Sequence, residues 1–256
     1  MTTADGSITD GATAQVQPSG ITLSDLTYAI DEKPILHGLT ATLTARRIGI
    51  VGRNGSGKST LARLLAGLIA PSSGTVSLGG IDPAKDRKAA LRHVGILFQN
   101  PDHQIIFPTV IEEITFGLRQ LGKSKAEAEA SARQTLESFG KSHWQDAHIT
   151  ALSQGQKHLL CLMAVSAMQP RIILLDEPFT GLDLPTRLQL RRYLARYKGQ
   201  LVHISHEPED LSDYDHVLWL EQGRIAQSGP AAAVLAAYVT EMTRQGGEDD
   251  LTDLPG

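Results

Sequence analysis

Apolar and polar residues alternate along the chain in two periods, one typical of strands and the other typical of helices. Unbroken apolar runs at residues 48–51 and 172–175 predict strands buried on both faces. Leucines recur at helical spacing from Ser59 and stop before the Pro-Ser-Ser-Gly segment at residues 71–74, which predicts a helix between these points. Further strands, the first two in a small sheet, are expected at residues 21–23, 39–44, 75–78, 94–98 and 201–204. Strands that alternate with helices predict an α/β fold with a parallel sheet.

The pattern becomes helical after residue 99. The segments Thr109 to Glu112 and Ser124 to Glu127 both place Glu three residues after a hydroxyl residue, which is a capping box. We therefore expect residues of about 100–170 to form a helical lobe inserted between strands of the core. We expect a flexible N-terminal tail at residues 1–20, one domain at residues 21–240 and a flexible acidic C-terminal tail at residues 241–256.

Composition narrows the class of protein. A chain of 256 residues suffices for one compact domain or for one core with an inserted lobe. The only cysteine, Cys161, excludes an intramolecular disulfide. A net charge of −4 provides no basic surface for nucleic acid. No segment approaches the about 20 apolar residues of a membrane span, so we expect any membrane association to go through protein partners.

A phosphate-binding loop follows the first buried strand. Residues 52–59, GRNGSGKS, fit the pattern G-x-x-x-x-G-K-[ST]. The glycines let backbone N–H groups surround a β-phosphate, and the following helix adds the positive end of its dipole. Lys58 is expected to reach the β- and γ-phosphates and the Ser59 hydroxyl to ligate Mg²⁺. The residues expected to bind phosphate are Gly52, Arg53, Asn54, Gly55, Ser56, Gly57, Lys58, Ser59 and Thr60.

Two acids end the second buried strand. Ligands of open α/β sheets collect at the carboxyl ends of strands, so Asp176 and Glu177 are expected beside the phosphate loop. Asp176 is expected to hold Mg²⁺ through water, and Glu177 to polarise an attacking water.

Residues 152–156, LSQGQ, precede a predicted helix that runs to about Met168. Ser153 and Gln156 also form a capping box, so a purely structural cap is one reading of Ser153. Together with the phosphate loop and the acids, the pentapeptide resembles the LSGGQ signature of the ABC ATPase family, with Gln154 at the variable middle position. The resemblance covers residues of about 21–237. It implies a P-loop (RecA-like) ABC ATPase core with a small antiparallel β-subdomain and an inserted helical subdomain.

The same resemblance implies that the chain binds ATP and Mg²⁺ as a dimer. Its partner would be a second copy of the chain or a close paralogue. The segment that would face the nucleotide of the opposite subunit is Ser153, Gln154, Gly155 and Gln156. Gln99 matches the family's nucleotide-sensing glutamine and would join Ser59 and Asp176 at Mg²⁺. His206 matches the switch histidine at the γ-phosphate, so the expected catalytic residues are Glu177, His206 and Gln99. The loop that would cross the dimer interface is Gly181, Leu182 and Asp183.

The adenine position departs from the family pattern. Where the family places an aromatic residue to stack on adenine, the alignment puts Ile30, with Tyr28 two residues earlier. We expect Ile30 to pack on the base, with Tyr28 as the alternative.

Residues 99–104, QNPDHQ, look like a stretch of energy-coupling-factor (ECF) transporter ATPases. In that group a short helix, here Asp102, His103, Gln104 and Ile105, lies beside the groove for the coupling helices of a transmembrane protein. The run FPTVIEE at residues 107–113 and the LSQGQ segment are most similar to the ATPases of bacterial biotin ECF transporters, and cobalt and nickel relatives come second. The basic residues usual after the signature are reduced to Lys157 and His158.

This resemblance implies a peripheral ATPase on the cytoplasmic side of the bacterial inner membrane. It would energise import of a micronutrient, with biotin first, through an integral membrane coupling protein and a substrate-binding membrane protein. Two other functions compete with it. One is a soluble ABC ATPase in cluster assembly; the other is the ATPase of an importer with a periplasmic binding protein, against which residues 101–104 argue.

Overall fold

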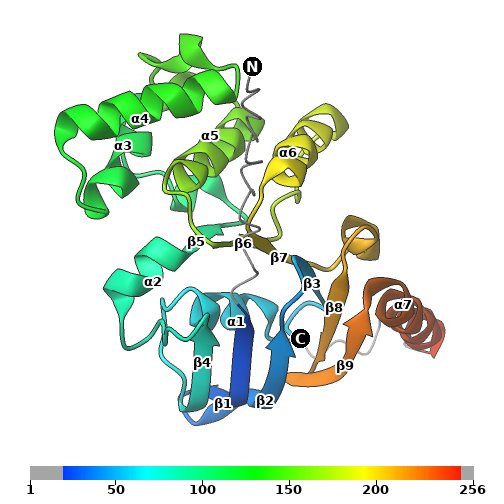
Figure 1. The fold of residues 1–256 in the computed structure, drawn as a ribbon. Coiled ribbons are helices and arrows are strands. Elements are labelled where there is room, and N and C mark those ends of the chain that lie inside the picture. Colours follow the sequence, from blue (N-terminus) through cyan, green and yellow to red (C-terminus); the bar gives the residue numbers. More distant parts are fainter. Residues whose placement is uncertain (1–19, 249–256) are drawn as a thin grey trace, which may run out of the picture.

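The computed structural model describes residues 20–248 (Figure 1). The expected N-terminal tail, apart from Gly20, and residues 249–256 of the expected C-terminal tail lie outside the described residues. No helix within the described part is both long and apolar enough to cross a membrane.

A large sheet of six strands forms the centre of the molecule, with the order β5-β6-β7-β3-β8-β9. Its strands are β3 (Arg47–Val51), β5 (Val94–Leu97), β6 (Ile172–Asp176), β7 (Gln200–Ser205), β8 (His216–Glu221) and β9 (Arg224–Pro230). All neighbours pair in parallel except β8 and β9. Both faces of β6 are covered, because Ile172 and Leu174 belong to one hydrophobic cluster and Ile173 and Leu175 to another. The prediction of doubly buried strands is therefore confirmed.

A smaller antiparallel sheet of three strands packs on one face of the core, with the order β2-β1-β4. Its strands are β1 (Ile21–Ile30), β2 (Lys33–Leu43) and β4 (Ser73–Leu78). Helix α1 (Lys58–Leu65) lies between the two sheets, and its leucines share a buried cluster with both (Figure 1). Helix α2 (Arg87–His93) follows β4.

A helical lobe lies between β5 and β6 in the chain and projects from the opposite end of the molecule (Figure 1). It contains the 3₁₀ helices η1 (Pro101–His103), η2 (Ser142–Trp144) and η3 (Ile149–Ala151), and the helices α3 (Val110–Gln120), α4 (Lys125–Ser138) and α5 (Gln154–Ala167). The capping box of Ser124 and Glu127 is confirmed. The box at Thr109 forms only in part, because the Glu112 carboxylate accepts the Thr109 hydroxyl at 2.5 Å instead of its backbone N–H. Cys161 is fully buried in α5, and burial raises the pKa of its thiol.

Two helices complete the core, α6 (Leu184–Arg196) and α7 (Ala231–Glu248). The expectation of a tail from residue 241 is wrong up to Glu248, because α7 continues to that residue. Val234 and Tyr238 of α7 are buried against the sheet, which anchors the helix. Near its end, Gln245 accepts a hydrogen bond of 2.8 Å from Arg53.

Candidate nucleotide-binding site

The phosphate loop connects the end of β3 to the start of α1. Its backbone is closely packed, because a Cβ added at Gly52 would lie 2.1 Å from the carbonyl oxygen of Leu220. Gly57 caps α1 in the left-handed region, with φ of 100°, a conformation that glycine adopts without strain. The local fold therefore requires both glycines, and it directs the N-terminal N–H groups of α1 toward the loop.

Lys58 is buried at the centre of this loop. Its Nζ donates to the carbonyl oxygens of Gly52 at 2.8 Å and Arg53 at 2.9 Å. Burial lowers the pKa of Lys58, whereas the nearby Glu177 and Asp176 raise it. The two carbonyls hold the ammonium inside the loop, where its charge is suited to binding a phosphate.

The Ser59 hydroxyl donates to a carboxylate oxygen of Asp176 at 3.1 Å, so the structure brings together two of the residues expected at Mg²⁺. Burial raises the pKa of Asp176, and the bond from Ser59 opposes that rise. One hydroxyl and one carboxylate fit Mg²⁺, which keeps several waters and takes few protein ligands beside phosphate. Within residues 20–248, no group of three or more His, Cys, Asp or Glu side chains is arranged to hold a metal ion by itself.

Glu177 and His206 lie in contact at the carboxyl ends of neighbouring strands. Nδ1 of His206 is 2.7 Å from Oε2 of Glu177. Glu177 has φ of 51°, in the left-handed region that costs a non-glycine residue energy and is common at functional sites. The backbone N–H of Glu177 donates to Ile204 of β7 at 3.0 Å, which fixes the two strand ends relative to each other.

His203, three residues before His206, differs from it in environment. It is buried within β7, its Nδ1 lies 2.9 Å from the Tyr214 hydroxyl, and burial lowers its pKa to about 3. Its position inside the sheet excludes the metal pair that His203 and His206 could suggest from their spacing.

The LSQGQ segment begins α5. Ser153 caps the helix by accepting from the Gln156 N–H, and Gln156 accepts from the Ser153 N–H at 2.8 Å, so the capping box is confirmed. Gly155 packs against α6, because an added Cβ would lie 2.6 Å from Cγ2 of Thr186. The α6 cap is Asp183, the last residue of the expected interface loop, which accepts from the Thr186 N–H at 3.0 Å. The tertiary structure thus joins the LSQGQ segment to this loop.

Within the described part of the chain, no hydrogen bond or ion pair joins residues 153–156 to the phosphate loop. The phosphate loop, the two acids and His206 are therefore grouped at one edge of the sheet, and the LSQGQ segment makes its contacts elsewhere, with α6 and within α5.

The packing of Gly155 on Thr186 predicts the effect of a small substitution. Gly155→Ala is expected to lower the free energy of unfolding by about 1–2 kcal/mol, because an overpacking cost of about 1–3 kcal/mol exceeds the gain in helix propensity of at most about 1 kcal/mol. Urea denaturation measures this change. In a double-mutant cycle, Thr186→Ala should recover at least about half of the loss, since the two side chains are in contact. Additive effects would contradict the packing argument.

The adenine candidates differ in exposure. Ile30, at the end of β1, is 49% exposed, whereas Tyr28 packs against the buried cluster between the sheets. The geometry thus favours Ile30 as the surface for a base, which stays a prediction.

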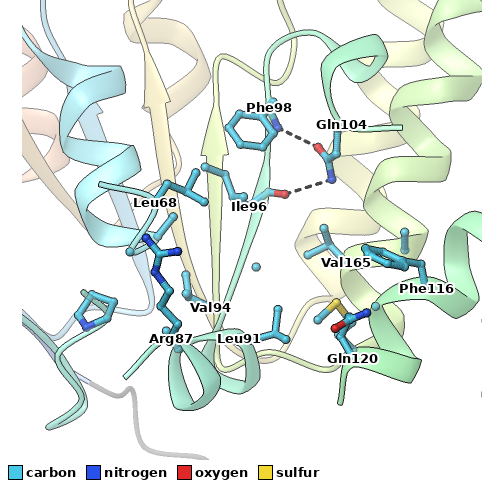
Figure 2. A pocket seen from close by; sticks show the side chains of 18 of the residues that line it. Leu68, Arg87, Leu91, Val94, Ile96, Phe98, Gln104, Phe116, Gln120 and Val165 are labelled. Carbon is cyan, nitrogen blue, oxygen red and sulfur yellow. Dashed lines mark hydrogen bonds between the residues drawn. The ribbon is translucent and has the colours of Figure 1, made fainter. Parts of the chain in front are cut away.

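An apolar groove with a volume of ≈ 420 Å³ is lined by residues of α2, β5 and the lobe helices α3 and α5 (Figure 2). Of the four residues expected beside a partner groove, only Gln104 lines this one, and its amide bonds to the backbone of Phe98 at 3.1 Å and of Ile96 at 3.2 Å. Asp102 instead forms an ion pair of 2.7 Å with Lys157, and His103 is exposed.

Sequence reasoning missed most of this groove. Its rim carries exposed large apolar side chains: Leu68, Leu91, Ile106 and Phe116. Phe116 lies off the buried stripe of α3, which is formed by Val110, Glu113, Ile114 and Leu118. A large apolar residue on the polar side of a helix is the signal that could have identified this surface.

Gln99 lies just beyond the end of β5 and is exposed. Its carbonyl oxygen lies 3.0 Å from Nε2 of His158. The segment that starts at Gln99 therefore connects the carboxyl edge of the sheet, the groove and α5.

Comparison with known proteins identifies the class that has this fold and site. A family model described as ABC transporter matches residues 36–180. The chain is 50% identical over 222 residues to the biotin transport ATP-binding protein BioM of Rhodobacter capsulatus, covering 87% of this chain and 95% of that protein. It is 36% identical over 218 residues to the energy-coupling factor transporter ATP-binding protein EcfA of Methanothermobacter thermautotrophicus, covering 82% of this chain and 70% of that protein. The solved structure of cbiO1 from Clostridium perfringens, described as part of the ABC transporter complex cbiONQ, matches with a TM-score of 0.73 and 26% identity, over 85% of this chain and 91% of that one.

The chain belongs to the ABC transporter family. It is an ATP-binding subunit and an ATP hydrolase of the kind that is coupled to transport. The resemblance to ABC ATPases and the fold class expected from the sequence are confirmed.

Proposed function

We propose that the chain works as a dimer that binds two Mg²⁺·ATP and uses their hydrolysis to energise ECF-type import of biotin across the bacterial cytoplasmic membrane. The observation that carries the substrate is the 50% identity to BioM over 95% of that protein's length. The relation to EcfA supports the ECF type. An ATPase subunit of this kind does not contact the transported molecule. The substrate is therefore assigned from the similarity to BioM, and the ATP chemistry from the residues of the nucleotide-binding site.

The chemistry follows from six side chains at the carboxyl edge of the large sheet. Lys58 and the N–H groups of the loop neutralise the β- and γ-phosphates, and Glu177 with His206 orients the attacking water. Ser59 and Gln99 would hold Mg²⁺ directly and Asp176 through water, and the ion would supply charge neutralisation for the phosphates. Most of the rate enhancement comes from positioning and from fixed charge, as in other phosphoryl transfers.

The separation of the LSQGQ segment from the phosphate loop supports a dimer. Each chain provides one phosphate loop and one α5 N-terminus, whose N–H groups and positive dipole end suit a γ-phosphate. In the dimer, Ser153 of one copy faces the nucleotide of the other, with residues 181–183 at the interface. A second copy of this chain gives two equivalent sites by symmetry.

The groove provides the contact with the membrane-embedded partner. Its apolar walls fit a short helix of an integral membrane coupling protein, which would in turn contact a substrate-binding membrane protein. In this arrangement the ATPase lies at the cytoplasmic face of the membrane without entering it.

Uptake in cells tests the transport assignment. Cells that contain this chain with its membrane partners are expected to accumulate labelled biotin at nanomolar supply, and cells in which the chain carries Lys58→Ala are expected to lose that accumulation. Labelled Co²⁺ is the matched control substrate. Accumulation of Co²⁺ without biotin would overturn the substrate assignment. Recovery of the chain from detergent-solubilised membranes with no integral membrane protein would favour the cluster-assembly alternative.

A further inference from the structure

One buried histidine bridges two segments of the proposed machinery. His158 lies in α5, two residues after the LSQGQ segment, and is 1% exposed. Its Nδ1 is 3.1 Å from the carbonyl oxygen of Gln154, and its Nε2 is 3.0 Å from that of Gln99. The first contact stays within α5, whereas the second joins α5 to the segment that follows β5.

Both partners of the ring are hydrogen-bond acceptors. A neutral imidazole carries a single N–H, so one tautomer donates to Gln99 and the other donates to Gln154. The bond between the two segments requires a hydrogen on Nε2. The Gln154 carbonyl lies in α5, where the backbone N–H four residues later is its regular donor, whereas no backbone N–H of the described residues donates to the Gln99 carbonyl, so a hydrogen on Nε2 leaves both carbonyls with a donor.

Two further contacts hold residues 99–104 in place, one to α5 and one to β5. The residue before His158, Lys157, forms the 2.7 Å ion pair with Asp102. The side-chain amide of Gln104 bonds to the backbone of Ile96 in β5 and of Phe98 just after it. Residues 99–104 are thus attached to β5 and to the start of α5, with Gln99 at one end and a groove-lining residue at the other.

We propose that His158 is a positioning residue that attaches the Gln99 segment to the helix of the LSQGQ segment. A displacement at the groove would then move Gln99 and the Ser153 end of α5 together. This role rests on the proposed function, in which Gln99 acts on the nucleotide of its own subunit and Ser153 on that of the other. His158 itself contacts neither nucleotide.

Two substitutions separate the two contacts of the ring. The side-chain nitrogen of Gln lies near the place of Nε2, and that of Asn lies near the place of Nδ1. His158→Gln therefore retains a donor for Gln99, whereas His158→Asn retains only the contact within α5. For His158→Asn we expect kcat of ATP hydrolysis to fall about three- to tenfold with KM for ATP changed less than about twofold, because one hydrogen bond of the working geometry is lost. His158→Gln is expected to retain at least about half of the wild-type kcat, since the bond persists.

The measurements use the full-length chain at saturating Mg²⁺, with urea denaturation to compare folding. His148→Asn, at an exposed histidine of the same lobe, is the matched control. Equal losses of kcat in the two His158 variants would assign the ring a packing role and overturn the proposal, as would full activity in both. Absence of ATP hydrolysis in the wild-type chain would contradict the proposed function instead, so the two failures are distinguishable.

Discussion

Glu177→Gln is expected to leave ATP binding intact and to lower ATP turnover by about 10²–10⁴-fold, the range that removal of a general base produces. The amide has nearly the shape of the carboxylate, so it keeps the contact with His206, but it no longer attracts a proton from water. Nucleotide binding by a fluorescent ATP analogue and phosphate release by the same preparation measure the two quantities.

The matched control is Glu209→Gln, which removes an exposed carboxylate from the segment that follows His206. It is expected to keep wild-type turnover, because its charge is solvated and lies outside the site. Near-normal turnover of Glu177→Gln would contradict the role of Glu177, even if the control behaves as expected.

Ser153→Asp is expected to lower turnover at least about tenfold, because it places a negative charge against the γ-phosphate of the opposite subunit. Asp caps a helix about as well as Ser, so the substitution preserves the structural role of residue 153. Ser153→Asn, a neutral residue that also caps well, is the control and is expected to keep more activity than Ser153→Asp. Equal activity of wild type and Ser153→Asp would favour the reading of Ser153 as a cap alone.

The Ser153→Asp variant also tests whether each site is built from both subunits. Lys58→Ala removes the cation of the phosphate loop and leaves Ser153 intact. When the Ser153→Asp and Lys58→Ala chains are co-expressed and mixed dimers are isolated through two different tags, one of the two sites per dimer is complete. We expect about half of the wild-type turnover if the two sites work independently. Turnover at the background level of the single variants would contradict sites shared in this way.

The sequence determined the features whose cause is local. The phosphate loop, the acids after β6 and the caps of α4 and α5 each lie in one short segment, where glycine conformation, strand burial and hydrogen bonding between near neighbours dictate the structure. The carboxyl-edge rule of parallel sheets then predicted that Asp176 and Glu177 lie beside the loop, and Asp176 bonds to Ser59.

Residues distant in sequence depend on packing that no local pattern expresses. His203 and His206 both lie near a strand end, yet β7 ends at Ser205, which buries the first and leaves the second in contact with Glu177. The helix α7 continues past residue 240 because its apolar side is buried on the sheet, although its last residues look like a polar tail in the sequence.

Only the tertiary structure decided which segments act together. The groove needs walls from several elements, Gly155 is explained by a threonine of α6, and His158 reaches a carbonyl 59 residues earlier in the chain. Such contacts depend on how helices and strands pack against each other. Local sequence specifies the elements and their chemical groups, and long-range packing specifies the distances between them.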